Sequence, residues 1–173
     1  IHPFLVGNGR LGRLLITLIL CESGLLSSPV LYLSLYLKKN RRLYYELLQE
    51  VRSNGSWEVW LAFFLEGIYT SGKETVKTIK LMNSCFEKDH VTIQSLGRAR
   101  FSAEKVLNFM KHLPQVTVAL VTKELSITAP AARDALNRLV KLGIVDEVSG
   151  KAHGKIYVYR RYLALLEEGA EPL

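Results

Sequence analysis

Apolar residues recur at helical spacing through the first half of the chain and predict a series of α-helices. The first is expected over residues 9–22, ahead of a Ser-Gly stop. A Ser-Pro pair predicts a second helix over residues 28–38, because proline is favoured in the first turn of a helix. A third is expected over residues 41–52, and a long fourth helix begins after Ser56. This half of the chain is therefore predicted to form a helical domain.

Two apolar stripes in this half are predicted to face a core. The stripe of the first helix consists of Leu14, Leu15, Leu18 and Ile19. The stripe of the long helix consists of Trp57, Trp60, Leu61, Phe64, Leu65 and Ile68.

After about residue 90 the pattern changes to short helices followed by β-rich segments. Helices are expected over residues 102–111, 116–124 and 128–142. Two strands, 144–148 and 155–160, flank the turn at Ser149-Gly150-Lys151, and a last helix over residues 161–168 follows. This order is typical of a winged-helix domain. The predicted fold is therefore mainly α, with a helical core over residues 1–90 and a winged helix over residues 91–173.

The charge of the chain favours an anionic partner without concentrating on either domain. The 173 residues carry a net charge of +7. Residues 1–90 have 11 Lys and Arg against 8 Asp and Glu, and residues 91–173 have 12 against 8. No dense basic run marks nucleic acid as the default partner.

The cysteines and the apolar runs bear on the cellular context. Cys21 and Cys85 are 64 residues apart, without the spacing of a metal site or a disulfide framework, and suit the reducing cytoplasm. The longest apolar runs are too short for a membrane span, so no membrane partner is expected. The chain starts without methionine on its densest motif, and we expect further sequence upstream.

The densest motif is IHPFLVGNGRLGR, residues 1–13. Its glycines match G-x-G-x-x-G. A dinucleotide-binding fold also requires a strand before the glycines, a strand after the next helix and an acidic residue about 20 positions further on, and the sequence lacks all three. Glycines around Asn8 instead allow successive N–H groups to point into one concavity ahead of a helix N-terminus. Arg10 and Arg13 add positive charge there, and arginine pairs well with phosphate. The alternative interpretation is a glycine-rich turn with two surface arginines.

His2 lies close to this turn in the sequence. Its ordinary pKa near neutrality makes it a candidate general base for a reaction at a bound phosphate.

Residues 2–13 resemble the Fic motif, H-P-F-x-(D/E)-G-N-G-R-x-x-R. The similarity to Fic proteins with a C-terminal winged helix continues through LLITLILCESGLLSSPVLYLSLYLKKNRRLYYELLQEVR, WEVWLAFFLEG, ALNRLVKLGIVDEVSG and KIYVYRRYLALLEEG. The resemblance implies that the chain is the C-terminal part of such a protein, with a partial Fic-type core followed by the winged helix.

The resemblance implies a protein adenylyltransferase, which moves AMP from ATP to a Tyr, Thr or Ser hydroxyl of a target protein. His2 would accept the hydroxyl proton, and Phe4 would anchor the loop in the core. The transferred phosphoryl group would lie on Gly7, Asn8 and Gly9, and the leaving phosphates on Arg10 and Arg13. Other members of the wider superfamily transfer UMP, phosphate or phosphocholine, and the intact Gly-Asn-Gly-Arg favours AMP.

One position departs from the motif. Val6 stands where the family has the acidic ligand of Mg²⁺, and an aliphatic side chain offers this cation no oxygen. We therefore expect no protein metal ligand there, a weakened hold on Mg²⁺, and impaired transfer or a nucleotide-binding pseudoenzyme.

The winged helix supplies the rival hypothesis, a DNA-binding transcriptional regulator. Arg133, Arg138 and Lys141 on its third helix are the candidate DNA contacts, with Lys151, His153 and Lys155 at the wing tip. Acidic residues among them (Asp134, Asp146 and Glu147) dilute the positive field, and winged helices also dock proteins or form homodimers. The alternative partners are thus DNA, another protein or a second copy.

Overall fold

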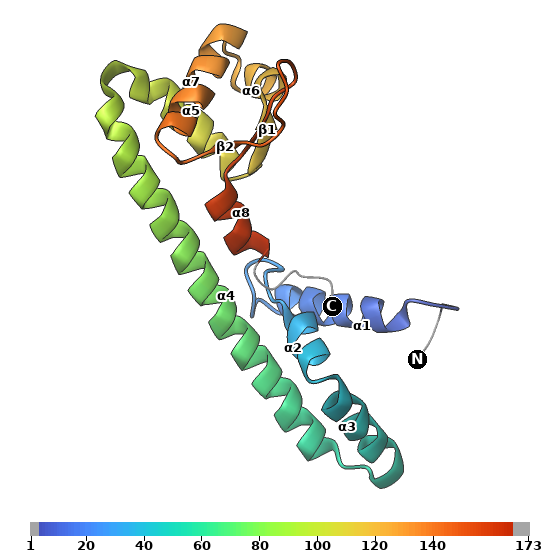
Figure 1. Cartoon of the computed structure of the whole chain (residues 1–173). Coiled ribbons are helices and arrows are strands. Elements are labelled where there is room, and N and C mark those ends of the chain that lie inside the picture. Colours follow the sequence, from blue (N-terminus) through green and yellow to red (C-terminus); the bar gives the residue numbers. More distant parts are fainter. Residues whose placement is uncertain (1–3, 168–173) are drawn as a thin grey trace. The chain divides into compact units, whose positions relative to one another are not determined.

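The computed structural model describes residues 4–167, which fall into two compact units that divide between residues 77 and 78. The division falls inside helix α4 (Trp57–Ile93), whereas the sequence pattern changes near residue 90. Helices predominate, and the only strands of the described part belong to one small antiparallel sheet (Figure 1). The predicted class, mainly α with a small β element, is confirmed.

The described residues of the first unit form helices and the loops between them. The unit contains α1 (Asn8–Glu22), α2 (Leu33–Lys39), α3 (Arg41–Asn54) and the first part of α4. Its core consists of the buried side chains Leu33, Leu37, Leu47 and Phe63. Gly67 permits a close approach of α4 to α2, because a Cβ atom there would lie 2.6 Å from Cδ1 of Tyr36.

The second helix begins later than predicted. Residues 28–32 are not helical, and α2 starts at Leu33 rather than at Ser28-Pro29. The amide of Val30 donates a 2.8 Å hydrogen bond to the carbonyl of Ser28, only two residues earlier, which is a tight turn and not the bonding pattern of an α-helix. The hydroxyl of Thr75 on α4 lies 3.3 Å from the carbonyl of Val30 and 2.9 Å from the carbonyl of Ser71 on its own helix.

The two predicted apolar stripes are only partly buried. In α1 the buried residue is Thr17, whereas Leu14, Leu15, Leu18 and Ile19 keep about half of their surface exposed. On α4, Trp60, Phe64 and Ile68 pack against the core, but Trp57, Leu61 and Leu65 are exposed. A helix buries only the stripe that meets a neighbour, so a second apolar stripe remains at the surface of the described unit.

The second unit has the predicted order of elements with two additions, a 3-10 helix and a first strand. After the end of α4 come η1 (Gln94–Ala99), α5 (Arg100–Met110), β1 (Gln115–Thr117), α6 (Val118–Leu125), α7 (Ala129–Lys141), β2 (Asp146–Glu147), β3 (Ile156–Val158) and α8 (Arg160–Glu167). Thr128 caps α7 by accepting a hydrogen bond from the amide of Ala131, as its position before the helix favours.

The sheet has three strands where two were predicted. Its order is β1-β3-β2, with both pairs antiparallel and Val116 opposite Tyr157. Residues 116 and 117, predicted as the start of a helix, instead belong to β1, in which Val116 is buried against the sheet while Gln115 remains exposed. The amide of Tyr159 donates to the carbonyl of Pro114 at 2.8 Å and extends the pairing past the end of β3.

The core of this unit joins α5, α6, α7 and the sheet. Ala132, Leu136 and Leu139 of α7 are completely buried and form its inward face, and Val140 beside them is half-buried. The last turns of α4 belong to the same core, where Ile93 is fully buried.

In the described part of the chain, no helix has both the length and the apolar character needed to cross a membrane.

Candidate functional site

The segment that leads into α1 is an open turn with a glycine at its critical position. Gly7 lies in the left-handed region (φ 86°, ψ −1°) and is the N-cap residue of α1. Its carbonyl accepts hydrogen bonds from the amides of Arg10 (3.0 Å) and Leu11 (3.1 Å). The amides of Asn8 and Gly9 precede these two in the first turn, where helix geometry offers no intrahelical acceptor. The turn therefore presents N–H groups at the positive end of the helix dipole.

The side chain of Asn8 braces this turn. Its Oδ1 accepts a hydrogen bond from the amide of Phe4 at 3.0 Å, and its Nδ2 donates to the carbonyl of Phe4 at 2.6 Å. Both polar atoms of Asn8 thus hold the loop of residues 4–8. In this arrangement the backbone N–H groups, and not the Asn8 side chain, are the donors available to an anion.

Phe4 does not have the environment expected of a core anchor. Its side chain is 57% exposed, and the loop is fixed through its backbone instead. The reason is local, because the two bonds to Asn8 determine the path of the chain while no core of the described residues encloses the ring.

Arg10 and Arg13 lie in the first turns of α1. Arg10 is exposed and Arg13 is half-buried. A Cβ atom at Gly9 would lie 3.5 Å from Nη1 of Arg13, so the guanidinium group folds back over the start of the helix. No carboxylate in residues 4–167 pairs with either arginine. The turn thus combines two arginines that have no counter-ion among the described residues with a helix N-terminus. This makes an electropositive site suited to phosphate.

The turn does not supply a carboxylate for a metal ion. Val6 is 83% exposed and has no oxygen, and Oδ1 of Asn8 already accepts a hydrogen bond. Over residues 4–167, no three His, Cys, Asp or Glu side chains come together as a possible metal site. The donor set at this turn therefore does not fit the acidic ligation that Mg²⁺ has in the Fic motif. The proposed general base, His2, lies outside the described residues.

We expect Asn8→Ala to loosen the turn. Loss of one hydrogen bond worth about 1 kcal/mol should speed amide exchange at Phe4 about fivefold, which NMR measures directly. Asn8→Asp keeps an oxygen acceptor for this amide and serves as the matched control. Unchanged exchange in Asn8→Ala would show that the side chain does not brace the loop.

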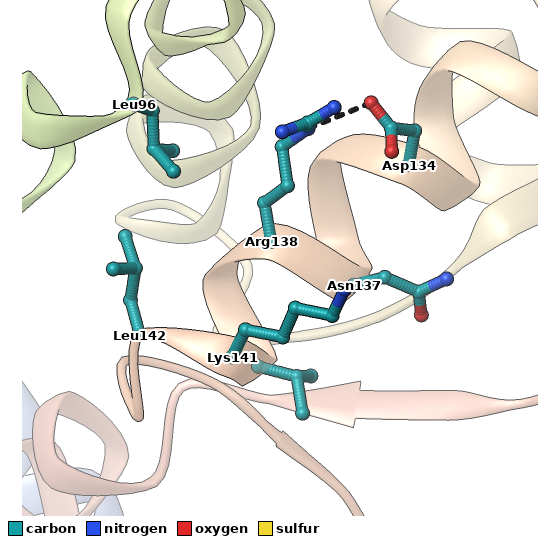
Figure 2. Close-up of a pocket in the computed structure, with 7 residues that line it drawn as sticks. Leu96, Asp134, Asn137, Arg138, Lys141 and Leu142 are labelled. Atoms are coloured by element: carbon teal, nitrogen blue, oxygen red, sulfur yellow. Dashed lines mark hydrogen bonds and ion pairs between the residues drawn. The ribbon is translucent and has the colours of Figure 1, made fainter.

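The second predicted surface is the outer face of α7. Arg133 and Lys141 are exposed, whereas Arg138 pairs with Asp134 through a 2.8 Å contact between Nε and Oδ2. Figure 2 shows Arg138 extending toward Asp134, beside the facing side chains of Leu96 and Leu142.

Two cations next to the wing are paired as well. Lys155 Nζ lies 3.8 Å from Oε2 of Glu147, and Arg160 Nε lies 3.0 Å from Oδ2 of Asp146. Glu147 also accepts hydrogen bonds from the Ser149 hydroxyl and the Ser149 and Gly150 amides, and these lower its pKa. The carboxylates noted in the sequence therefore neutralise individual cations of this surface.

A buried polar cluster in the second unit was not predicted. Asp89 on α4 is only 3% exposed, and its Oδ2 accepts a 2.6 Å hydrogen bond from the Tyr159 hydroxyl. Its Oδ1 lies 2.8 Å from Nη2 of Arg161 on α8. Burial, together with the hydrogen bond to Asp89, raises the pKa of Tyr159. The cluster stabilises the unit. It could not be predicted from local sequence, because Asp89 lies 70 or more positions from its partners Tyr159 and Arg161.

We also compared the sequence with models of known protein families, and none of them matches the chain. The resemblance to the Fic motif is therefore an interpretation of the sequence, and no family comparison adds to it.

Proposed function

We propose that the chain belongs to a protein adenylyltransferase of the Fic type whose transfer activity is impaired by Val6. The observation that carries the proposal is the turn at Gly7. It combines open helix amides with Arg10 and Arg13, which have no counter-ion among the described residues. Helix N-terminal amides and arginines of this kind are suited to the phosphates of a nucleoside triphosphate.

In the proposed reaction, a hydroxyl oxygen of the target protein bonds to the α-phosphorus of ATP. The bond from this phosphorus to the bridging oxygen of the β-phosphate breaks, and pyrophosphate leaves. His2 accepts the hydroxyl proton by resemblance to the motif. The amides of the turn stabilise the charge on the transferred group, and the two arginines hold the departing phosphates.

Val6 limits this chemistry because the turn contributes no carboxylate to the nucleotide's metal ion. ATP binding through the amides and arginines does not depend on that carboxylate. We therefore propose that nucleotide binding is retained and that transfer is slow, which makes a nucleotide-binding pseudoenzyme the limiting case.

Arg13→Ala should weaken ATP binding about tenfold, because a charge-assisted contact to phosphate is lost. Titration with ATP, followed calorimetrically, measures this change. Arg52→Ala is the matched control, since this exposed arginine lies at the far end of α3. Equal ATP affinity in the wild-type protein and Arg13→Ala would contradict a phosphate site at this turn.

A further inference from the structure

A cleft of about 400 Å³ lies on the second unit, between η1 and the C-terminal half of α7 (Figure 2). Leu96, Val140 and Leu142 form its apolar part. All three are half-buried and pack partly against the core of the unit, so the apolar surface that they leave open is held in place. The volume falls within the range of roughly 300–1,000 Å³ that is common for ligand sites.

The polar part of the cleft carries an excess of positive charge. Asp134 and Arg138 pair with each other, and their charges cancel. Lys141 also lines the cleft, is exposed, and pairs with no carboxylate of residues 4–167. The complementary ligand therefore combines an aliphatic group with a negative charge.

We propose that this cleft docks an acidic segment of a partner protein, with an aliphatic side chain of that segment between Leu96 and Leu142. A carboxylate next to it would face Lys141. Such a segment satisfies both halves of the cleft, since aliphatic contacts contribute affinity and the charge fixes orientation.

The same surface suits duplex DNA less well. A phosphate backbone has no aliphatic group to fill the apolar part of the cleft. DNA affinity also depends on several cations that are available to phosphates. Here Arg138, Lys155 and Arg160 are each paired with a carboxylate of the same unit, and Arg133, Lys141 and Lys151 are the candidate cations outside the ion pairs of the described residues.

A random peptide library displayed on phage, selected against the whole protein, tests this docking site. We expect the selected peptides to share an aliphatic residue next to Asp or Glu. A synthetic peptide of that consensus, followed by fluorescence anisotropy, should bind Lys141→Glu and Leu96→Ser about tenfold more weakly than the wild-type protein.

Lys123→Glu is the matched control, because it makes the same charge change on an exposed residue of α6 outside the cleft. Thermal unfolding of each variant verifies that the unit is folded. A selection without an acidic and aliphatic consensus, or unchanged peptide affinity in Lys141→Glu, would overturn the proposal. So would salt-dependent binding of random duplex DNA that Lys141→Glu abolishes while peptide binding persists.

Discussion

Val6→Asp should raise the rate of ATP-dependent self-labelling by about tenfold or more, because it restores the acidic residue of the motif. A factor of ten corresponds to about 1.4 kcal/mol of the activation barrier, a modest contribution for a recovered metal ligand. The position allows this change, since Val6 is 83% exposed and a carboxylate there is not buried. Incorporation of label from ATP, measured over time in both proteins, gives the ratio of rates.

The control for this prediction is Leu5→Asp, which adds the same charge at the neighbouring, fully exposed position. A general effect of negative charge beside the turn would appear in both variants, whereas ligation at the motif position would appear only in Val6→Asp. If the wild-type protein already labels itself as fast as Val6→Asp, the impaired state proposed here is wrong.

Asp89→Ala is expected to destabilise the second unit by about 2–3 kcal/mol. The substitution leaves the buried Tyr159 hydroxyl without its 2.6 Å acceptor and removes the partner of Arg161. Because Arg161 is itself 58% exposed, hydration of its guanidinium group offsets part of the free energy lost with the ion pair. Chemical denaturation of the two proteins measures the difference in the free energy of unfolding.

Asp146→Ala is the comparison at the surface. It breaks the ion pair with Arg160, in which both side chains are more than half exposed, and should cost less than about 1 kcal/mol. Equal losses in the two variants would mean that the Asp89 cluster contributes no more than an ordinary surface pair.

Local signals predicted most of the fold. Gly7 at the start of α1, Gly55 at the end of α3 and Thr128 ahead of α7 are residues whose own chemistry favours those positions. The predictions failed where a distant contact decides the local structure. β3 pairs with Gln115–Thr117, so the existence of β1 does not follow from local sequence.

The same distinction applies to the candidate site. The glycines and arginines of the turn were identified from their spacing, because adjacent residues in a short loop stay close in space. The hydrogen bonds between Asn8 and Phe4 were not predicted, because they depend on the side-chain rotamer of Asn8. The exposure of Phe4 was missed because the motif resemblance implied a buried anchor. Asp89 and Tyr159 had no sequence signal at all.

The most direct test of the central claim compares Val6→Asp with the double variant His2→Ala, Val6→Asp. Both proteins are incubated with ATP labelled on the α-phosphate and, separately, on the γ-phosphate. The account predicts protein labelling from the α-phosphate alone, and its loss in the double variant. Labelling from the γ-phosphate, or equal α-labelling with and without His2, would contradict AMP transfer at this turn.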